Sequence, residues 1–218
     1  GVSTDTQDIT GNIVAESAAL PDEAALREAI GRFIGDIEQI PPMYSAIKIG
    51  GKKLYELARR GESVERAPRK ITVSAIDIAG RDGDDYILNI SCSKGTYVRT
   101  LCSDIGEALG CGACMSCLRR TRAGVFSVDD AHSLADIEAA VREGRLSDII
   151  LPVDTLFASF PKLTVSQSAA KRLKNGNIIK ISAEDGEYKV YSDSDEFLLL
   201  GRVECGKLKT IKSFYEVS

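Results

Sequence analysis

The sequence lacks the side chains and motifs on which several enzyme classes depend. It contains no tryptophan and a single histidine, His132, which lies in a polar segment just before a predicted helix. Serine and cysteine hydrolases need a histidine base beside the nucleophile, and no Gly-x-Ser-x-Gly turn is present, so we do not expect that chemistry. Neither a P-loop nor a Gly-x-Gly-x-x-Gly motif occurs, which argues against a bound nucleotide cofactor.

Long apolar runs and a disulfide framework are also missing. No stretch approaches the roughly 20 apolar residues that a membrane-spanning helix needs, so we expect no membrane association. The chain has six cysteines, and Cys111, Cys114 and Cys117 have a spacing seen among metal ligands. No second Cys-x-x-Cys pair accompanies them, and the remaining candidates for a fourth ligand are Cys92, Cys102 and His132. We favour small apolar cysteines that pack in the protein, and keep a metal-binding protein only as a third hypothesis.

The charged residues are segregated along the chain. The net charge is −4, yet residues 42–70 carry eight Lys or Arg against three Glu, and residues 94–122 carry five against two acids. Positive charge concentrated on an otherwise acidic protein indicates a polyanion site, although two solvated helix faces would give the same count. Tyr44, Tyr55 and Tyr97 are interleaved with these cations, and aromatic rings can stack on unpaired bases. RNA binding is therefore the function that composition favours.

A strand-turn-helix boundary at residues 93–100 is the most informative local feature. Ser93, Lys94 and Gly95 form the turn, and Arg99 falls in the first turn of the predicted helix that follows. A cation at the positive end of a helix dipole is mildly unfavourable unless an anion lies nearby. The pattern therefore predicts an anionic partner for Arg99, either a carboxylate or a phosphate.

Apolar periodicity and turn residues predict the remaining elements. At the start of the chain we expect a hairpin around Thr10-Gly11-Asn12 and a helix from Pro21 through Ile37 that ends at Pro41-Pro42. An extended segment, 43–49, and a helix over 52–60 should follow. The rest of the first 150 residues should form strands over 71–78 and 86–92, a helix from Val98 to Leu109, a strand over 114–128 and a helix over 133–143. After a boundary near Leu151-Pro152 and Phe160-Pro161, we expect a helix over 166–174 and strands over 178–182, 187–191, 197–204 and 207–215.

Five segments resemble the TruB family of tRNA pseudouridine synthases. They are residues 1–8, 39–48, 51–61, 92–100 and 118–121, which follow in family order through about residue 126. The last 60 residues resemble the small PUA-type β domain that closes such chains. The resemblance implies an α+β fold with the antiparallel mixed sheet of the pseudouridine synthases, present in part. Residues 1–150 would form this catalytic domain, with a basic RNA-contacting insertion at 42–70, and residues 160–218 a PUA-like RNA-binding domain.

The resemblance also implies an activity. Family members are isomerases that convert a T-loop uridine of tRNA, at position 55, to pseudouridine without a metal or organic cofactor. Uracil leaves C1′, rotates and rejoins through C5, and the target nucleotide is flipped out of its stack to be reached. The implied partner is the T arm of tRNA, the implied location is the cytoplasm of a bacterium, and no protein partner is required by the complete, monomeric enzyme.

Site residues can be assigned by position within the matching segments. Arg99 matches the arginine that pairs with the catalytic aspartate, and a guanidinium there would keep a buried carboxylate ionised. Tyr97 would lie near the flipped base, and Leu118 matches the apolar wall of the base pocket. The resemblance and the charge pattern together assign RNA contacts to Lys94, Tyr44, Lys48, Lys52, Lys53, Arg59, Arg60, Arg119 and Arg120.

Two departures from the family pattern matter. The catalytic aspartate belongs to a Gly-x-Leu-Asp-Pro-like motif, and no Leu-Asp-Pro occurs in these 218 residues. We therefore expect a C-terminal fragment that is inactive alone, with Arg99 either solvated or bound to a bystander anion. Cys114 also stands where the family usually has histidine. A non-catalytic RNA-binding module on the same scaffold is the alternative hypothesis.

Overall fold

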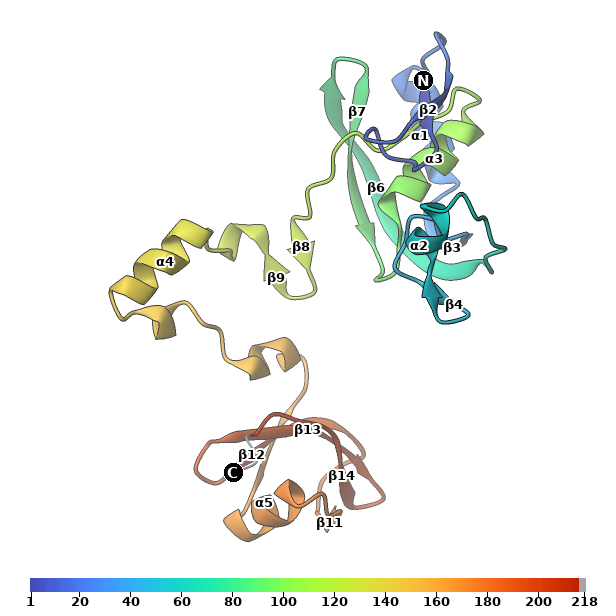
Figure 1. Ribbon diagram of the computed structural model, residues 1–218. Coiled ribbons are helices and arrows are strands. Elements are labelled where there is room, and N and C mark those ends of the chain that lie inside the picture. The colour runs from blue at the N-terminus through green and yellow to red at the C-terminus, as the bar shows by residue number, and fades with distance from the viewer. Residues whose placement is uncertain (216–218) are drawn as a thin grey trace. The chain divides into compact units, whose positions relative to one another are not determined.

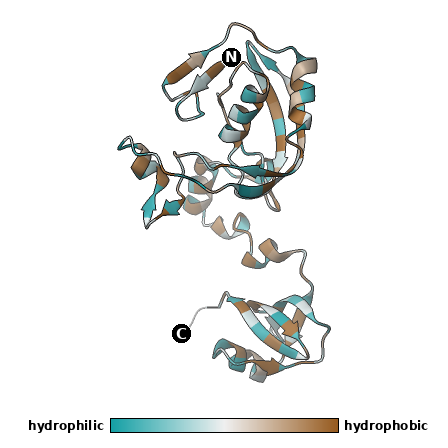
Figure 2. Ribbon diagram, turned by 90° about the vertical axis from the view of Figure 1, so that its right-hand side faces the viewer, coloured by the Kyte–Doolittle hydropathy of each residue, from teal (hydrophilic) through white to brown (hydrophobic). Residues whose placement is uncertain are grey.

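The computed structural model describes residues 1–215, which fall into two compact units that divide between Arg119 and Arg120 (Figure 1). Both contain β-sheets with a few helices, an α+β arrangement as the sequence predicts; the main sheet of the first unit is antiparallel and that of the second is mixed. Apolar and polar residues alternate along the strands (Figure 2). Within residues 1–215, no helix has the length and apolar character needed to span a membrane.

The first unit is organised on a three-stranded antiparallel sheet. Strand β6 (Arg69–Asp82) lies between β3 (Gly35–Gln39) and β7 (Asp85–Cys92), and helices α1 (Glu23–Gly31) and α3 (Val98–Ala108) pack against it. The buried side chains of this core come from both helices and β6; they are Leu26, Ile30, Ile71, Val73, Ile76, Leu101 and Ile105. A β-bulge follows Val73, so the inward positions change from odd to even residue numbers, and Ile76 still faces the helices.

The predicted helix from Pro21 through Ile37 is wrong in its second half. Asp22 caps the helix by accepting a hydrogen bond from the Ala25 amide at 2.8 Å, but α1 ends at Gly31. Gly35 has φ of 110°, which glycine adopts easily, and the chain then turns into β3. Ile37 pairs with Ile71 across the sheet and packs against the core from a strand. The apolar spacing of three or four residues therefore runs through two successive elements, α1 and β3.

Two short hairpins lie outside the three-stranded sheet. Strands β1 (Val2–Thr4) and β2 (Ile13–Glu16) form the predicted N-terminal hairpin. In the basic insertion, β4 (Lys48–Ile49) and β5 (Lys52–Lys53) form a tight hairpin, and α2 (Leu54–Ala58) follows. The predicted helix over 52–60 is therefore shorter than expected, because both lysines belong to the hairpin that turns at Gly50 and Gly51.

The predicted strand over residues 114–128 is also wrong. Met115 makes an isolated bridge to Asp8, and the only strands are β8 (Arg122–Ala123) and β9 (Phe126–Ser127). Gly124, with φ of 61°, lies in the turn that folds β8 back on β9, so residues 114–128 cannot extend as one strand.

The second unit begins with short helices and ends in a small β domain. Helix α4 (Leu134–Arg142) and three 3-10 turns, η1 (Val128–Asp130), η2 (Leu146–Asp148) and η3 (Val153–Phe157), precede the strands. The sheet order is β10-β12-β13-β14-β11, where β10 (Lys162–Val165) lies parallel to β12 (Gly186–Ser192) and the other pairs are antiparallel. The remaining elements are α5 (Gln167–Lys174), β11 (Ile179–Lys180), β13 (Phe197–Glu204) and β14 (Lys207–Ser213).

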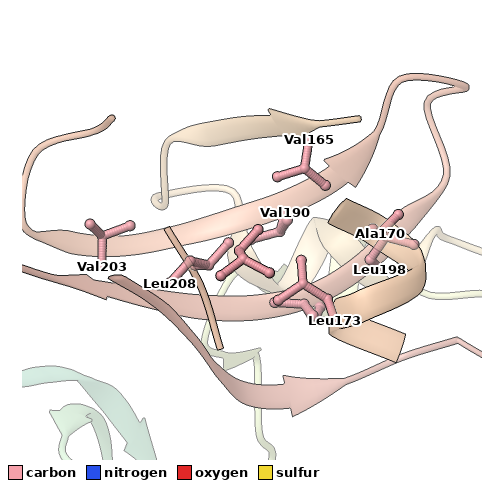
Figure 3. Close-up of a cluster of buried hydrophobic side chains, with 9 residues drawn as sticks. Val165, Ala170, Leu173, Val190, Leu198, Val203 and Leu208 are labelled. Atoms are coloured by element: carbon pink, nitrogen blue, oxygen red, sulfur yellow. The ribbon is translucent and has the colours of Figure 1, made fainter. Parts of the chain in front are cut away.

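The core of this β domain is wholly aliphatic. Leu173 of α5 packs with Val190, Leu198 and Leu208 from three different strands, and all four side chains are fully buried (Figure 3). The four predicted strands are confirmed, with β11 shorter than expected, while β10 was not predicted. Phe157 of η3 packs on Phe214 with ring centroids 5.2 Å apart, and Asp154 accepts a hydrogen bond from Tyr191. Burial and this bond raise the pKa of Tyr191 to about 12.

Candidate RNA-binding and catalytic site

Arg99 lies in the first turn of α3, as the sequence predicts. Gly95, with φ of 89°, reverses the chain after β7, and Tyr97 precedes the helix in an extended conformation. The Arg99 side chain is half-buried, and its Nη2 donates a hydrogen bond to the carbonyl oxygen of Tyr44 at 3.0 Å. Among the described residues, the partner of Arg99 is thus a backbone carbonyl, which provides partial negative charge; the solvated or anion-bound state expected for the remaining N–H groups stays a prediction.

Two glutamines hold the residues on either side of Arg99. The Gln39 side chain, 3% exposed, donates from Nε2 to the Tyr97 carbonyl at 3.1 Å and accepts from the Tyr97 amide at 2.8 Å. Buried Thr100 donates from Oγ1 to Oε1 of Gln7 at 2.7 Å. Sequence reasoning missed both glutamines. Gln39 lies two residues after Ile37, on the same inward face of β3, and this alternation could have identified it as buried.

Asp8 is the carboxylate with an electrostatic link to Arg99. Hydrogen bonds from the Thr10 side chain and amide, with a smaller contribution from the positive charge of Arg99, lower the pKa of Asp8. Asp8 makes no ion pair with Arg99, and neither does any other acid among residues 1–215. The half-buried guanidinium therefore has N–H donors without an acidic partner in the described part of the chain.

A small cavity of about 200 Å³ borders this arrangement. Its lining includes Gln7 and Tyr44, the same two residues that contact Thr100 and Arg99. Arg66 also lines it; the side chain donates from Nη1 to the Pro41 carbonyl at 2.9 Å, while its buried Nε has no partner. From the sequence, Arg66 is only one of the cations of the basic insertion.

The basic insertion presents most of its predicted RNA contacts to solvent. Lys48, Lys52, Arg59 and Arg60 are exposed. Lys53 is half-buried, because its Nζ hydrogen-bonds to the Tyr55 hydroxyl at 3.1 Å, and this bond raises the pKa of Lys53. Nζ of Lys53 and the Arg59 guanidinium both lie over the Tyr55 ring, at 5.3 and 5.4 Å from its centroid. The insertion therefore combines exposed cations with a ring that already binds cations.

The other predicted site residues are not all gathered at Arg99. Tyr97 and Tyr44 are half-buried beside it, and Lys94 is exposed on the turn before α3. Leu118, 53% exposed, lies in an irregular segment together with exposed Arg119. Arg120 is exposed and begins the second unit.

The cysteines are all free thiols with different surroundings. Burial raises the pKa of Cys102 to about 11, so this thiol is protonated at neutral pH. Cys111, Cys114 and Cys117 lie in the loop after α3, where Gly106 packs on Ala113 too closely for a side chain. Within residues 1–215, no three histidine, cysteine or acidic side chains are grouped as metal ligands.

Family models match most of the chain. Residues 1–98 match the model described as "TruB family pseudouridylate synthase (N terminal domain)". Residues 99–158 match the "tRNA pseudouridylate synthase B C-terminal domain". The boundary between the two models thus falls at Arg99.

Curated relatives carry the same description. The "tRNA pseudouridine synthase B" of Chromohalobacter salexigens is 43% identical, over 95% of this chain and 69% of its own length. The protein of that name from Burkholderia mallei is 42% identical over 95% of this chain and 71% of its own length. That of Alkaliphilus oremlandii is 48% identical over 82% of this chain and 59% of its own length.

Solved structures share the fold. The structure titled "Crystal Structure of a Cbf5-Nop10-Gar1 Complex" superposes with a TM-score of 0.67 at 24% identity, over 92% of this chain and 63% of that chain. One titled "Structure of H/ACA RNP bound to a substrate RNA containing 2'-deoxyuridine" gives 0.66 at 22% identity, over 92% of this chain and 64% of that chain. At these identities the likeness concerns the fold alone. This chain spans less than two thirds of either of those chains.

Proposed function

This chain belongs to the TruB family of pseudouridylate synthases, and from that premise we propose that the protein isomerises a uridine of tRNA to pseudouridine. The observation that carries the proposal is the 43% identity to a tRNA pseudouridine synthase B across 95% of the chain. The half-buried Arg99, held at the start of α3 by the Tyr44 carbonyl, supports it. We propose further that the target is the T-loop uridine at position 55, flipped out of its stack to reach the site.

Arg99 is proposed to hold the catalytic carboxylate. A guanidinium has five N–H donors, and Arg99 gives one hydrogen bond to the Tyr44 carbonyl, so a two-point contact with a carboxylate is still open. The positive charge would keep that carboxylate ionised inside the protein. Tyr97 would pack near the flipped base, and Leu118 would supply apolar wall once RNA and the carboxylate-bearing segment are in place. These roles are predictions carried by position in the family motifs.

RNA binding is proposed for both units. In the first, the exposed cations of the insertion 42–70 would contact phosphates of the T arm, with Lys94, Arg119 and Arg120 as further contacts. In the second, Arg172, Lys180 and Lys207 surround a concave surface with Ile178 and Ile179 at the end of α5. We propose that this surface gives the PUA-like domain, residues 160–218, its own contact to the RNA backbone. No metal, organic cofactor or protein partner enters the proposal, and the complete enzyme would act as a monomer in the cytoplasm.

A non-catalytic RNA-binding module is the second candidate. It is favoured by one observation, that no carboxylate among residues 1–215 forms an ion pair with Arg99. Both candidates require the same basic surface, and they differ only in whether a uridine is changed.

The deciding experiment measures pseudouridine directly. The full gene product that contains these residues is incubated with an unmodified tRNA transcript, and pseudouridine is mapped by carbodiimide modification and primer extension. We expect one modified position, the T-loop uridine, and no product on a transcript in which that uridine is replaced by cytidine. Pseudouridine at another position would contradict the T-loop assignment. Tight binding without any pseudouridine would favour the non-catalytic module.

Charge reversal in the insertion is expected to weaken RNA binding. Lys52→Glu together with Lys53→Glu should lower affinity for a T-arm hairpin by about tenfold or more at low salt. If both lysines contact phosphates, the slope of log affinity against log salt should become shallower by about two. Fluorescence anisotropy at several salt concentrations measures both quantities.

A matched control separates a local contact from a change in overall charge. Arg27→Glu with Arg32→Glu makes the same change in charge on the exposed face of α1. We expect this control to leave the salt slope unchanged. Equal losses of affinity in the two double variants would mean that only the net charge of the protein matters.

A further inference from the structure

The buried side chain of Gln39 makes a two-point contact with the main chain of Tyr97. It is 3% exposed at the end of β3, and both polar atoms of its amide bond the main chain of one residue, the N–H and the C=O of Tyr97. This two-point contact joins residues 58 positions apart in the sequence. A buried amide with both bonds made to main chain constrains the position and the direction of that main chain.

Tyr97 is the residue that starts α3. Its carbonyl also accepts the first hydrogen bond of the helix, from the Leu101 amide at 3.1 Å, and no side chain of the local sequence caps this end. Helices usually begin with a Ser, Thr, Asp or Asn that caps its own first turn. At α3 no such cap is made; instead the Gln39 side chain of β3 fixes the main chain of Tyr97, the residue directly before the helix.

The same strand exit reaches the Arg99 side chain. Five residues after Gln39, the Tyr44 carbonyl receives the Arg99 guanidinium. Pro41 and Pro42 lie buried between them and restrict the backbone. Segment 39–44 therefore hydrogen-bonds to the N-terminal turn of α3 at two points, the main chain of Tyr97 and the guanidinium of Arg99.

We infer that Gln39 is a positioning residue for the reaction: its amide sets the place and direction of the turn that carries Tyr97 and Arg99. The inference rests on the proposed function for its effect on turnover. Catalytic groups must be held within about 0.5 Å of the productive geometry, and a misplacement of 1 Å can cost on the order of 100-fold in rate. Gln39 is 3% exposed and its amide bonds the main chain of Tyr97, so we expect its loss to lower kcat and leave tRNA affinity unchanged.

Two substitutions test this in the full gene product. Gln39→Met has a similar volume and makes neither hydrogen bond, and we expect kcat to fall at least tenfold with the Kd for tRNA within twofold of wild type. Gln39→Glu adds a test by pH. The neutral carboxyl can donate to the Tyr97 carbonyl and accept from its amide, as glutamine does, whereas the carboxylate can only accept. Burial raises the pKa of such a carboxyl, so the neutral form should be reached at mildly acidic pH.

The pH profile distinguishes positioning from general damage. The kcat of Gln39→Glu, divided by that of wild type at the same pH, should rise as pH falls from 8.5 to 6, while the ratio for Gln39→Met stays flat. Gln167→Met is the matched control, because Gln167 is exposed at the start of α5 and should leave kcat unchanged. A flat Gln39→Glu ratio, or a wild-type kcat in Gln39→Met, would overturn the inference. The pH series is measured on a single variant, so Gln39→Glu tests the positioning role even where Gln39→Met folds poorly.

A second readout does not need activity. Amide hydrogen exchange of Tyr97, followed by NMR in the 218-residue chain, should accelerate at least tenfold in Gln39→Met and not in Gln167→Met. Unchanged exchange would overturn the inference, because the amide would then not hold the turn. Absence of pseudouridine in the wild-type assay would instead overturn the proposed function and leave this result to stand by itself.

Discussion

The 218-residue chain alone should bind tRNA and form no pseudouridine. Its sequence contains no Leu-Asp-Pro, and no acidic side chain among residues 1–215 forms an ion pair with Arg99. The proposed role of Arg99 requires a carboxylate at the reacting nucleotide, and Arg99 itself cannot supply one. Product from the chain alone should therefore stay at the level of the enzyme-free control, while the full gene product converts the transcript under the same conditions.

The control for this experiment is binding. The same preparation should retain affinity for a T-arm hairpin, since the exposed cations of the insertion are present. Lost activity with retained binding would place the defect in the chemical step. Pseudouridine formed by the chain alone would contradict the prediction. Asp8→Asn would then be the first variant to examine, because the charge of Arg99 contributes to lowering the pKa of Asp8.

Arg99→Ala in the full gene product should abolish most of the turnover. Removing one partner of a buried, hydrogen-bonded charge pair costs about 2–5 kcal/mol, which corresponds to roughly 30- to 5,000-fold in rate. Arg99→Lys keeps the positive charge and loses the planar two-point contact, so we expect a smaller but still large defect. Single-turnover kinetics with saturating enzyme measure the chemical step apart from tRNA binding.

Binding and folding supply the controls for Arg99. The Kd for tRNA should stay within about threefold, since the proposed partner is a protein carboxylate and not a phosphate. The hydrogen bond to the Tyr44 carbonyl contributes on the order of 1–3 kcal/mol to stability, so Tm must be compared alongside the rates. Arg27→Ala, on the exposed face of α1, should change nothing. If Arg99→Ala loses affinity in proportion to rate, Arg99 is a phosphate contact instead.

Periodicity alone could not separate some neighbouring elements. Ile37 continues the helical spacing of Leu26 and Ile30, yet it belongs to β3, because Gly35 redirects the chain and β6 offers a strand to pair with. Residues 114–128 were predicted as one strand, and the turn at Gly124 leaves two short strands instead. In both places the local pattern was compatible with two structures, and pairing partners elsewhere in the chain selected one.

The sequence by itself determined the family, the α+β class and the start of α3, and it predicts a negative partner for Arg99. These depend on short motifs, turn residues and the direction of a helix dipole, which are local in the chain. Only the tertiary structure decided three hydrogen-bonded contacts: Arg99 with the Tyr44 carbonyl, Gln39 with the main chain of Tyr97, and Thr100 with Gln7. Those contacts join residues 55, 58 and 93 positions apart, and a side chain's hydrogen-bond partner across such a distance depends on the packing of the whole unit.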